Sequence, residues 1–148
     1  MKGFTFIELL IVIAIMLVIA VAASPIYGNL MASSQLNENT SQIIQIVRTA
    51  REQSSAWLND SAHGVYFNIT EKKYILYQGD SYASRNTNYD RETSLDSSLS
   101  LSTTLSNNEI NFSKGLGMPN NTGNITLSHD ASNSRIITIN SFGMTEQN

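Results

Sequence analysis

The sequence predicts an α+β protein, with one long N-terminal helix followed by a small antiparallel β domain. The first 30 residues contain a long apolar run, residues 33–58 have a helical period, and the rest alternates between apolar and polar positions. The chain has 148 residues. About 90 of them remain beyond the helix, which is enough for one modest core.

The first half of the helix is strongly apolar. Leu9–Ala23 contains only Leu, Ile, Val, Ala and Met. Extended through residue 32, it is long enough to cross a bilayer as a tilted helix, which takes about 20 residues. Lys2, on the short N-terminal side, predicts that this end stays in the cytoplasm. Residues 4–32 are therefore expected to form the transmembrane half of the helix.

Glu8 places a single carboxylate at the edge of this apolar run. An acid inside a bilayer costs roughly 2.5–3.5 kcal/mol on insertion scales, so such residues usually have a partner. If the chain were cut after Gly3, the new ammonium group of Phe4 could pair with Glu8 of a neighbouring subunit. Two other interpretations stay open. Glu8 lies at the headgroup level and reaches water, or Ala20-Val21-Ala22 ends a cleavable secretory signal peptide.

Residues 33–58 are predicted to continue the helix as an amphipathic segment. One face carries a mostly apolar stripe: Leu36, Ile43, Val47, Ala50, Ser54 and Trp57. Pro25 is expected to kink the helix, because proline removes a backbone donor and clashes with the preceding turn. At 1.5 Å per residue, about 55 helical residues span roughly 80 Å, so the helix is expected to protrude from the domain.

Residues 59–148 are predicted to form the β domain. Strands are expected at 64–69, 73–78, 98–102, 109–113, around 125–127, and at 135–141. Turn-forming residues separate them, notably at 115–123 and 130–133. The pattern gives six or seven short strands, most of them with one buried face.

The segment Gly3-Phe4-Thr5-Phe6-Ile7-Glu8, followed by its apolar run, resembles the N-terminal signal of type IV pilins and type II secretion pseudopilins. The resemblance implies that a prepilin peptidase cuts after Gly3, that the new N-terminal Phe4 is methylated, and that Glu8 guides assembly. Residues 1–3 would then be a leader. Pro25 also stands where these pilins carry a helix-kinking proline.

The β domain resembles the GspH/FimT group of minor pseudopilins and minor pilins. The resemblance rests on residues 77–82, 88–92, 112–117, 125–127 and 137–140. It implies a pilin-like fold, in which the long helix packs on two small antiparallel sheets with six to eight short strands.

The function implied by both resemblances is that of a structural subunit of a type IV pilus or a type II secretion pseudopilus. Its expected partners are other subunits, the prepilin peptidase and the membrane. It would sit in the cytoplasmic (inner) membrane with a single pass and an extracytoplasmic domain, and then in a periplasmic or cell-surface filament. The alternative is a DNA- or ligand-binding minor pilin of the same architecture.

Little else in the sequence points to chemistry. No catalytic motif is present, so no enzyme activity and no cofactor is expected. The chain has no cysteine, and neither histidine has an evident third ligand, so no metal site is expected. Because the net charge is −3 and the cations are scattered, no nucleic-acid partner is expected, with a local patch of Lys72, Lys73 and Lys114 as the alternative.

The most distinctive stretch of the β domain is the segment 79–91. Its two acids, Asp80 and Asp90, could hold Ca²⁺. The simpler interpretation is that they pair with nearby arginines and fix a long surface loop. Exposed tyrosines would make this loop a contact surface. The candidate contact residues are Asp80, Tyr82, Arg85, Tyr89, Asp90 and Arg91.

Overall fold

The computed structural model of the chain describes residues 3–129 and 133–147, except for the side chains of residues 22–27 and 29. Three predicted features therefore lie outside the described residues: Lys2, the side chain of Pro25, and residues 130–132 of the predicted turn at 130–133. The chain divides into two compact units, Met1–Ser34 and Gln35–Asn148.

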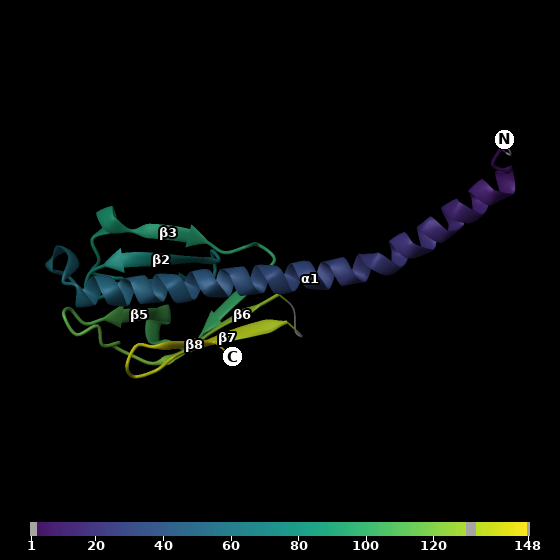
Figure 1. The fold of residues 1–148 in the computed structure, drawn as a ribbon. Coiled ribbons are helices and arrows are strands. Elements are labelled where there is room, and N and C mark those ends of the chain that lie inside the picture. Colours follow the sequence, from purple (N-terminus) through teal and green to yellow (C-terminus); the bar gives the residue numbers. More distant parts are fainter. Residues whose placement is uncertain (1–2, 130–132, 148) are drawn as a thin grey trace. The chain divides into compact units, whose positions relative to one another are not determined.

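One helix, α1, runs from Phe6 to Ser55 and passes through both units (Figure 1). The prediction of one long helix is confirmed, with ends two or three residues inside the predicted ones. The helix is continuous through Pro25, and the kink there stays a prediction.

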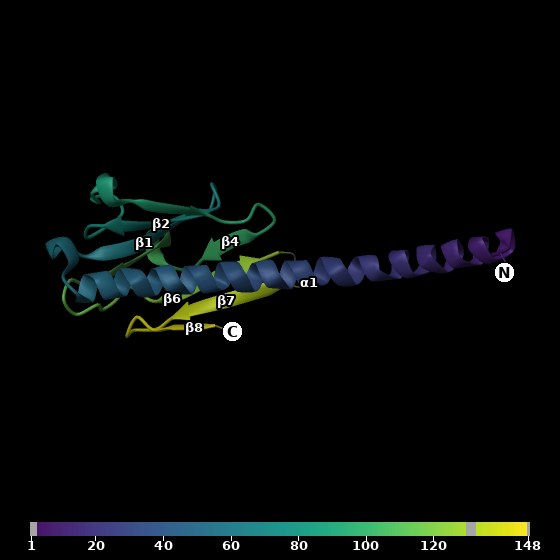
Figure 2. The same cartoon turned by 45° about the horizontal axis from the view of Figure 1, so that its top comes forward.

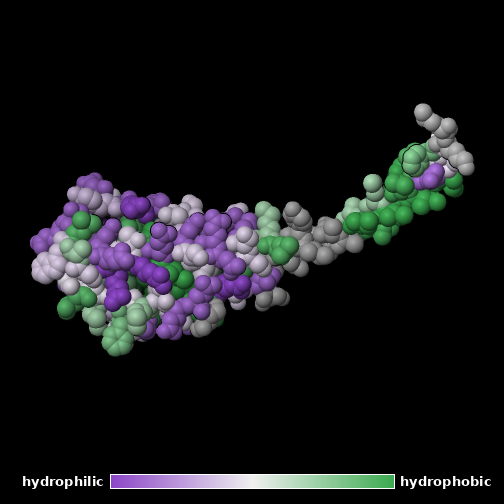
Figure 3. Space-filling view, viewed as in Figure 1, coloured by the Kyte–Doolittle hydropathy of each residue, from purple (hydrophilic) through white to green (hydrophobic). Residues whose placement is uncertain are grey.

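In the first unit, the large apolar side chains of α1 from Phe6 to Val21 are exposed. Their exposed fractions run from 42% for Val12 to 76% for Phe6. Figure 3 shows this part of the helix as a mainly hydrophobic surface. Nevertheless, among the residues that could be searched, no stretch of helix is both long and apolar enough to span a bilayer. The membrane-spanning role of residues 4–32 therefore stays a prediction.

In the second unit, α1 packs on the β domain through the predicted stripe. Five of its six members, from Leu36 to Ser54, are fully buried. The sixth, Trp57, is 58% exposed, so its predicted place in the stripe is wrong. The helix has already ended at Ser55, and Trp57 adopts a left-handed φ of 57°, which turns its side chain out of the helical period.

Two four-stranded antiparallel sheets make up the β domain (Figures 1 and 2). The first sheet has the order β3-β2-β1-β5, and its strands are β1 (His63–Asn68), β2 (Lys73–Gln78), β3 (Arg91–Ser94) and β5 (Glu109–Phe112). The second has the order β4-β6-β7-β8, with β4 (Ser100–Thr103), β6 (Gly123–Ser128), β7 (Ser134–Ile139) and β8 (Thr145–Gln147). Both the two sheets and the strand number implied by the resemblance are confirmed.

The sequence pattern missed two strands, β3 and β8. Both are edge strands, and they are short and largely exposed, so they lack the alternation of apolar residues that predicts a strand. The predicted surface loop consequently ends one residue into β3.

The core lies between α1 and the inner faces of both sheets. In the first sheet, alternate residues of three strands face the helix and belong to one cluster with Ile43 and Val47: Val65, Phe67, Tyr74, Leu76, Ile110 and Phe112. The intervening residues of the same strands face the opposite side, because strand side chains alternate.

Candidate assembly motif and surface loop

The N-terminal motif forms a reciprocal cap at the start of α1. The Glu8 carboxylate Oε2 accepts hydrogen bonds from the Thr5 backbone N–H at 3.4 Å and from the Thr5 hydroxyl at 3.5 Å. The Glu8 N–H in turn donates to Thr5 Oγ1 at 3.4 Å. This arrangement is a capping box, which satisfies donors that the first helical turn leaves unpaired.

Sequence reasoning missed this local role, although Thr5 and Glu8 have the spacing of a capping box. A cap also provides a reason for an acid at Glu8 that needs no neighbouring subunit. The contacts with Thr5 use Oε2, which leaves Oε1 able to accept from a second donor. Phe4, the residue that would carry the new ammonium group, is 84% exposed.

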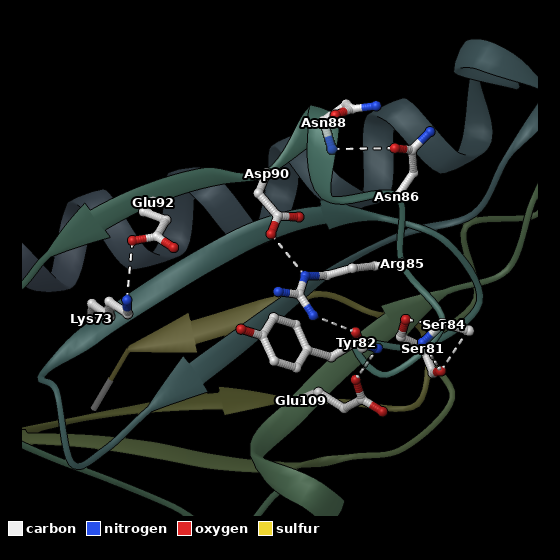
Figure 4. Close-up of polar contacts among 10 residues, drawn as sticks. All are labelled: Lys73, Ser81, Tyr82, Ser84, Arg85, Asn86, Asn88, Asp90, Glu92 and Glu109. Atoms are coloured by element: carbon white, nitrogen blue, oxygen red, sulfur yellow. Dashed lines mark hydrogen bonds and ion pairs between the residues drawn. The ribbon is translucent and has the colours of Figure 1, made fainter.

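The segment 79–91 lies across the outer face of the first sheet and is anchored there (Figure 4). The Tyr82 ring stacks on Tyr66 of β1, with 3.8 Å between the ring centroids. Arg85 lies over the Tyr82 ring, 3.7 Å from its centroid. Tyr82 is therefore partly buried, and the expectation of an exposed Tyr82 is wrong.

Glu109 on β5 is the main polar anchor of this segment. Its carboxylate is buried and accepts hydrogen bonds from the Tyr82 N–H at 2.8 Å and from the Tyr77 hydroxyl at 3.0 Å. Asn111, two residues along the same strand, donates to the Gly79 carbonyl at 2.8 Å. Burial raises the pKa of Tyr77 well above its ordinary value, with an opposing effect from the Asn111 hydrogen bond. Tyr77 thus stays protonated and acts as a donor.

A close ion pair ties the middle of the segment to its C-terminal end. Arg85 donates to Asp90 Oδ2 at 2.8 Å and to the Tyr82 carbonyl at 2.8 Å. The hydrogen bond to Asp90 is the main reason why the pKa of Arg85 is raised. The predicted pairing of a loop acid with a loop arginine is confirmed for Asp90 and Arg85.

Calcium binding by this segment is not supported. Asp90 is engaged with Arg85, and the described residues contain no group of three or more acids, histidines or cysteines placed to hold a metal ion. Asp80 and Arg91 are exposed, and Tyr89 is 51% exposed, so these three remain available at the surface.

The residues that hold the segment were not found from the sequence. Tyr66, Tyr77, Glu109 and Asn111 come from three strands, and only the antiparallel register brings them together. Gly64 contributes by being small, because a Cβ there would lie 2.5 Å from the Tyr77 ring. The one local signal was Glu109, an acid in an otherwise strand-like stretch.

The lysines of the alternative basic patch have partners. Lys73 forms ion pairs with Glu71 and Glu92, and Lys114 pairs with Asp60. The ammonium group of Lys72 donates to the Ser97 carbonyl at 2.7 Å. Two of the three positive charges are therefore compensated by nearby acids.

Comparisons with known proteins concern the N-terminal motif and the fold. Residues 1–24 match the model of the prokaryotic N-terminal methylation motif. A comparison with curated protein sequences gave no significant match.

Solved structures share the fold at low sequence identity. The minor pseudopilin EpsH from the Type 2 Secretion System of Vibrio cholerae matches with a TM-score of 0.59 and 12% identity, over 77% of this chain and 96% of that one. The type IV minor pilin FimU of Pseudomonas aeruginosa matches with a TM-score of 0.60 and 12% identity, over 78% and 89% of the two chains. The chain thus has the fold of type IV pilin-like minor subunits, preceded by an N-terminal methylation motif.

Proposed function

We propose that this chain is a minor structural subunit of a type IV pilus or of a type II secretion pseudopilus. In this proposal a prepilin peptidase cuts between Gly3 and Phe4, the new N-terminus of Phe4 is methylated, and the subunit assembles through its N-terminal helix. The observation that carries the proposal is a methylation motif that includes the apolar start of a long helix, in a chain with a pilin-like fold.

Exposed apolar surface on α1 supports assembly through the helix. From Phe6 to Val21 the large apolar side chains are all at least 42% exposed. Fully burying one such side chain contributes about 1.5–3 kcal/mol, so a subunit gains from covering this surface with lipid before assembly and with other helices after it.

Glu8 supports a defined register between subunits. Its carboxylate stands four residues after the proposed new N-terminus. The contacts with Thr5 use Oε2, so Oε1 can accept from another donor. The ammonium group of Phe4 in a neighbouring subunit would form a charge-assisted hydrogen bond there. The cap and the intersubunit pair would then use different oxygens of the same carboxylate.

The decisive experiment is the intact mass and N-terminal sequence of membrane-extracted protein, with and without a prepilin peptidase. We expect a chain that begins at methylated Phe4 only when the peptidase is present. The matched variant Gly3→Val should stay uncut under the same conditions. A chain that begins after Ala22, or that keeps Met1 beside an active peptidase, would contradict the proposal.

A further inference from the structure

A groove runs between α1 and the β2–β3 side of the first sheet. Its first part has a volume of about 340 Å³, with α1 residues from Gln42 to Thr49 on one side and Tyr74, Leu76, Arg91 and Thr93 on the other. A second part, of about 110 Å³, shares the lining residues Leu76 and Arg91 with the first and is also lined by His63 and Tyr89. Both parts lie within Gln35–Asn148, so the groove is independent of the N-terminal motif.

The β3 side of this groove is an open sheet edge. The Leu95 N–H donates to the Lys72 carbonyl at 2.8 Å. In an antiparallel pair of strands, every second residue directs its backbone N–H and C=O groups to the partner strand, so this bond shows which residues of β3 do so. By that alternation, the backbone N–H and C=O groups of Glu92 and Ser94 point away from β2. Figure 1 shows β3 as the outermost strand on this side.

The opposite edge of the same sheet is covered. Beside β5, the Asn120 N–H donates to the Asn111 carbonyl, and Phe112 forms a bridge with Pro119. Of the two edges of this sheet, β3 is therefore the one whose backbone groups remain open to a further strand.

The groove has a single charged lining residue, Arg91. Within the described residues Arg91 forms no ion pair, although the chain as a whole carries a net charge of −3. Charged residues on an edge strand normally discourage pairing with other chains. Here the charge of Arg91 favours an acidic partner strand over an apolar one. An acidic strand can form an ion pair with Arg91, whereas an apolar strand would cover this charge without compensating it.

His63 lines the second part of the groove and has a buried nitrogen without a hydrogen-bond partner in the described part of the chain. Its side chain is only 4% exposed, and Nδ1 has no hydrogen-bond partner among the described residues. A buried polar atom without a partner destabilises the fold, so an occupant that supplies a hydrogen-bond partner is favoured.

We propose that this groove binds an extended, acidic segment of a partner protein, which adds to β3 as a further strand and places a carboxylate against Arg91. Backbone hydrogen bonds to Glu92 and Ser94 would give the affinity, and the acid would give the specificity, as in other cases of strand addition. The mixed polar and apolar lining, from Gln45 to Leu76, suits alternate side chains of such a strand.

The test uses the full chain in detergent micelles and a fluorescein-labelled octapeptide of alternating Glu and Thr, with fluorescence anisotropy as the readout. We expect saturable binding, at least tenfold weaker for the matched Gln/Thr peptide and for the Arg91→Gln chain. Equal binding of both peptides, or no binding at millimolar peptide, would overturn the proposal.

Strand addition is tested separately from charge. Ser94→Pro removes one outward N–H and no ladder bond to β2, so binding should fall at least tenfold, while Ser94→Ala should bind like the parent. An octapeptide with alternate backbone amides methylated should also fail, and this measurement does not depend on a variant that folds. If charge matters but neither backbone change does, Arg91 is only a carboxylate contact and strand addition is wrong. Sedimentation that reveals Arg91-dependent dimers of the chain would assign the groove to a second copy and would overturn binding of a partner protein.

Discussion

The Tyr82 ring lies nearly parallel to that of Tyr66, with 3.8 Å between centroids and 11° between planes. Tyr82 comes from the long segment between β2 and β3, and Tyr66 from the middle of β1. This stack turns a segment with the composition of a mobile surface loop into a cover for one face of a sheet.

Removal of the stack should loosen the segment and destabilise the domain. We expect Tyr82→Ala to lower the free energy of unfolding by about 1–3 kcal/mol, because it loses the aromatic pair and the apolar burial together. The measurement is chemical unfolding of the full chain in micelles, with limited proteolysis of residues 79–91 as a local readout. Tyr89→Ala, at an exposed position, should change stability by about 0.5 kcal/mol or less. Equal effects of the two changes would contradict the anchoring role.

Glu109 should be needed as an acceptor more than as a charge. Glu109→Leu would leave the Tyr82 N–H and the Tyr77 hydroxyl without their partner, and we expect a loss of about 2–4 kcal/mol. Glu109→Gln keeps a carbonyl oxygen in place and should cost about half as much or less. Thermal unfolding of both variants at neutral pH checks this order. A Gln variant as unstable as the Leu variant would show that the charge itself is required.

Gly64 should not tolerate even a methyl group. A Cβ at this position would lie 2.5 Å from the Tyr77 ring and 2.6 Å from the Ile110 carbonyl, so Gly64→Ala should destabilise by about 1–3 kcal/mol. Gly28→Ala is the matched control, since a Cβ there would meet nothing within 4 Å and alanine favours helix. The control should be neutral or slightly stabilising in the same unfolding experiment. A Gly64→Ala chain as stable as the parent would mean that Tyr77 can shift without cost.

His63 should make stability depend on pH below neutrality. Burial lowers its pKa from the ordinary 6.5, and the nearby Ser61 backbone opposes the shift. The unfolded chain therefore binds a proton at a higher pH than the folded chain does. Stability should be full above pH 6.5, fall as the pH drops below that value, and level off below the folded pKa. The test measures the free energy of unfolding from pH 7.5 to about 5. Its decrease with falling pH should be smaller in His63→Gln than in the parent. In His129→Gln the slope should persist, and an unchanged slope in His63→Gln would contradict the assignment.

The capping and assembly roles of Glu8 should separate genetically. Thr5→Ala removes the reciprocal hydrogen bonds but keeps the carboxylate, so amide exchange at residues 6–8 should speed up while filaments still form. Glu8→Gln should still be cut and methylated, but should enter filaments poorly, because the charge partner of Phe4 is gone. Thr5→Ser is the control that keeps the cap. Normal assembly of Glu8→Gln would leave Glu8 with the capping role alone.

Local signals in the chain predicted most of the architecture. The apolar run and the stripe from Leu36 to Ser54 predicted α1, and alternation predicted strands at 73–78 and 109–112 almost to the residue. Such predictions succeed because the period of a helix or strand depends on neighbouring residues. The strands β3 and β8 were missed because their order comes from pairing with a neighbour strand, and their exposed residues carry no period.

In the candidate contact segment, too, local features were predicted and contacts with distant residues were not. Its charge pair, Asp90 with Arg85, is local and was predicted, whereas the anchors Tyr66 and Glu109 are distant in sequence and were not. Tyr82 was expected at the surface because nothing near it in the chain indicates the ring on which it stacks.

The N-terminal motif, the long helix and the class of fold could be predicted from the chain alone, since each depends on residues close together in sequence. The tertiary structure alone decided which face of the first sheet is covered by residues 79–90 and which edge stays open beside Arg91. The physical reason is that sheet register sets both outcomes at once: it places Tyr66 under Tyr82, and it turns the backbone groups of Glu92 and Ser94 outward.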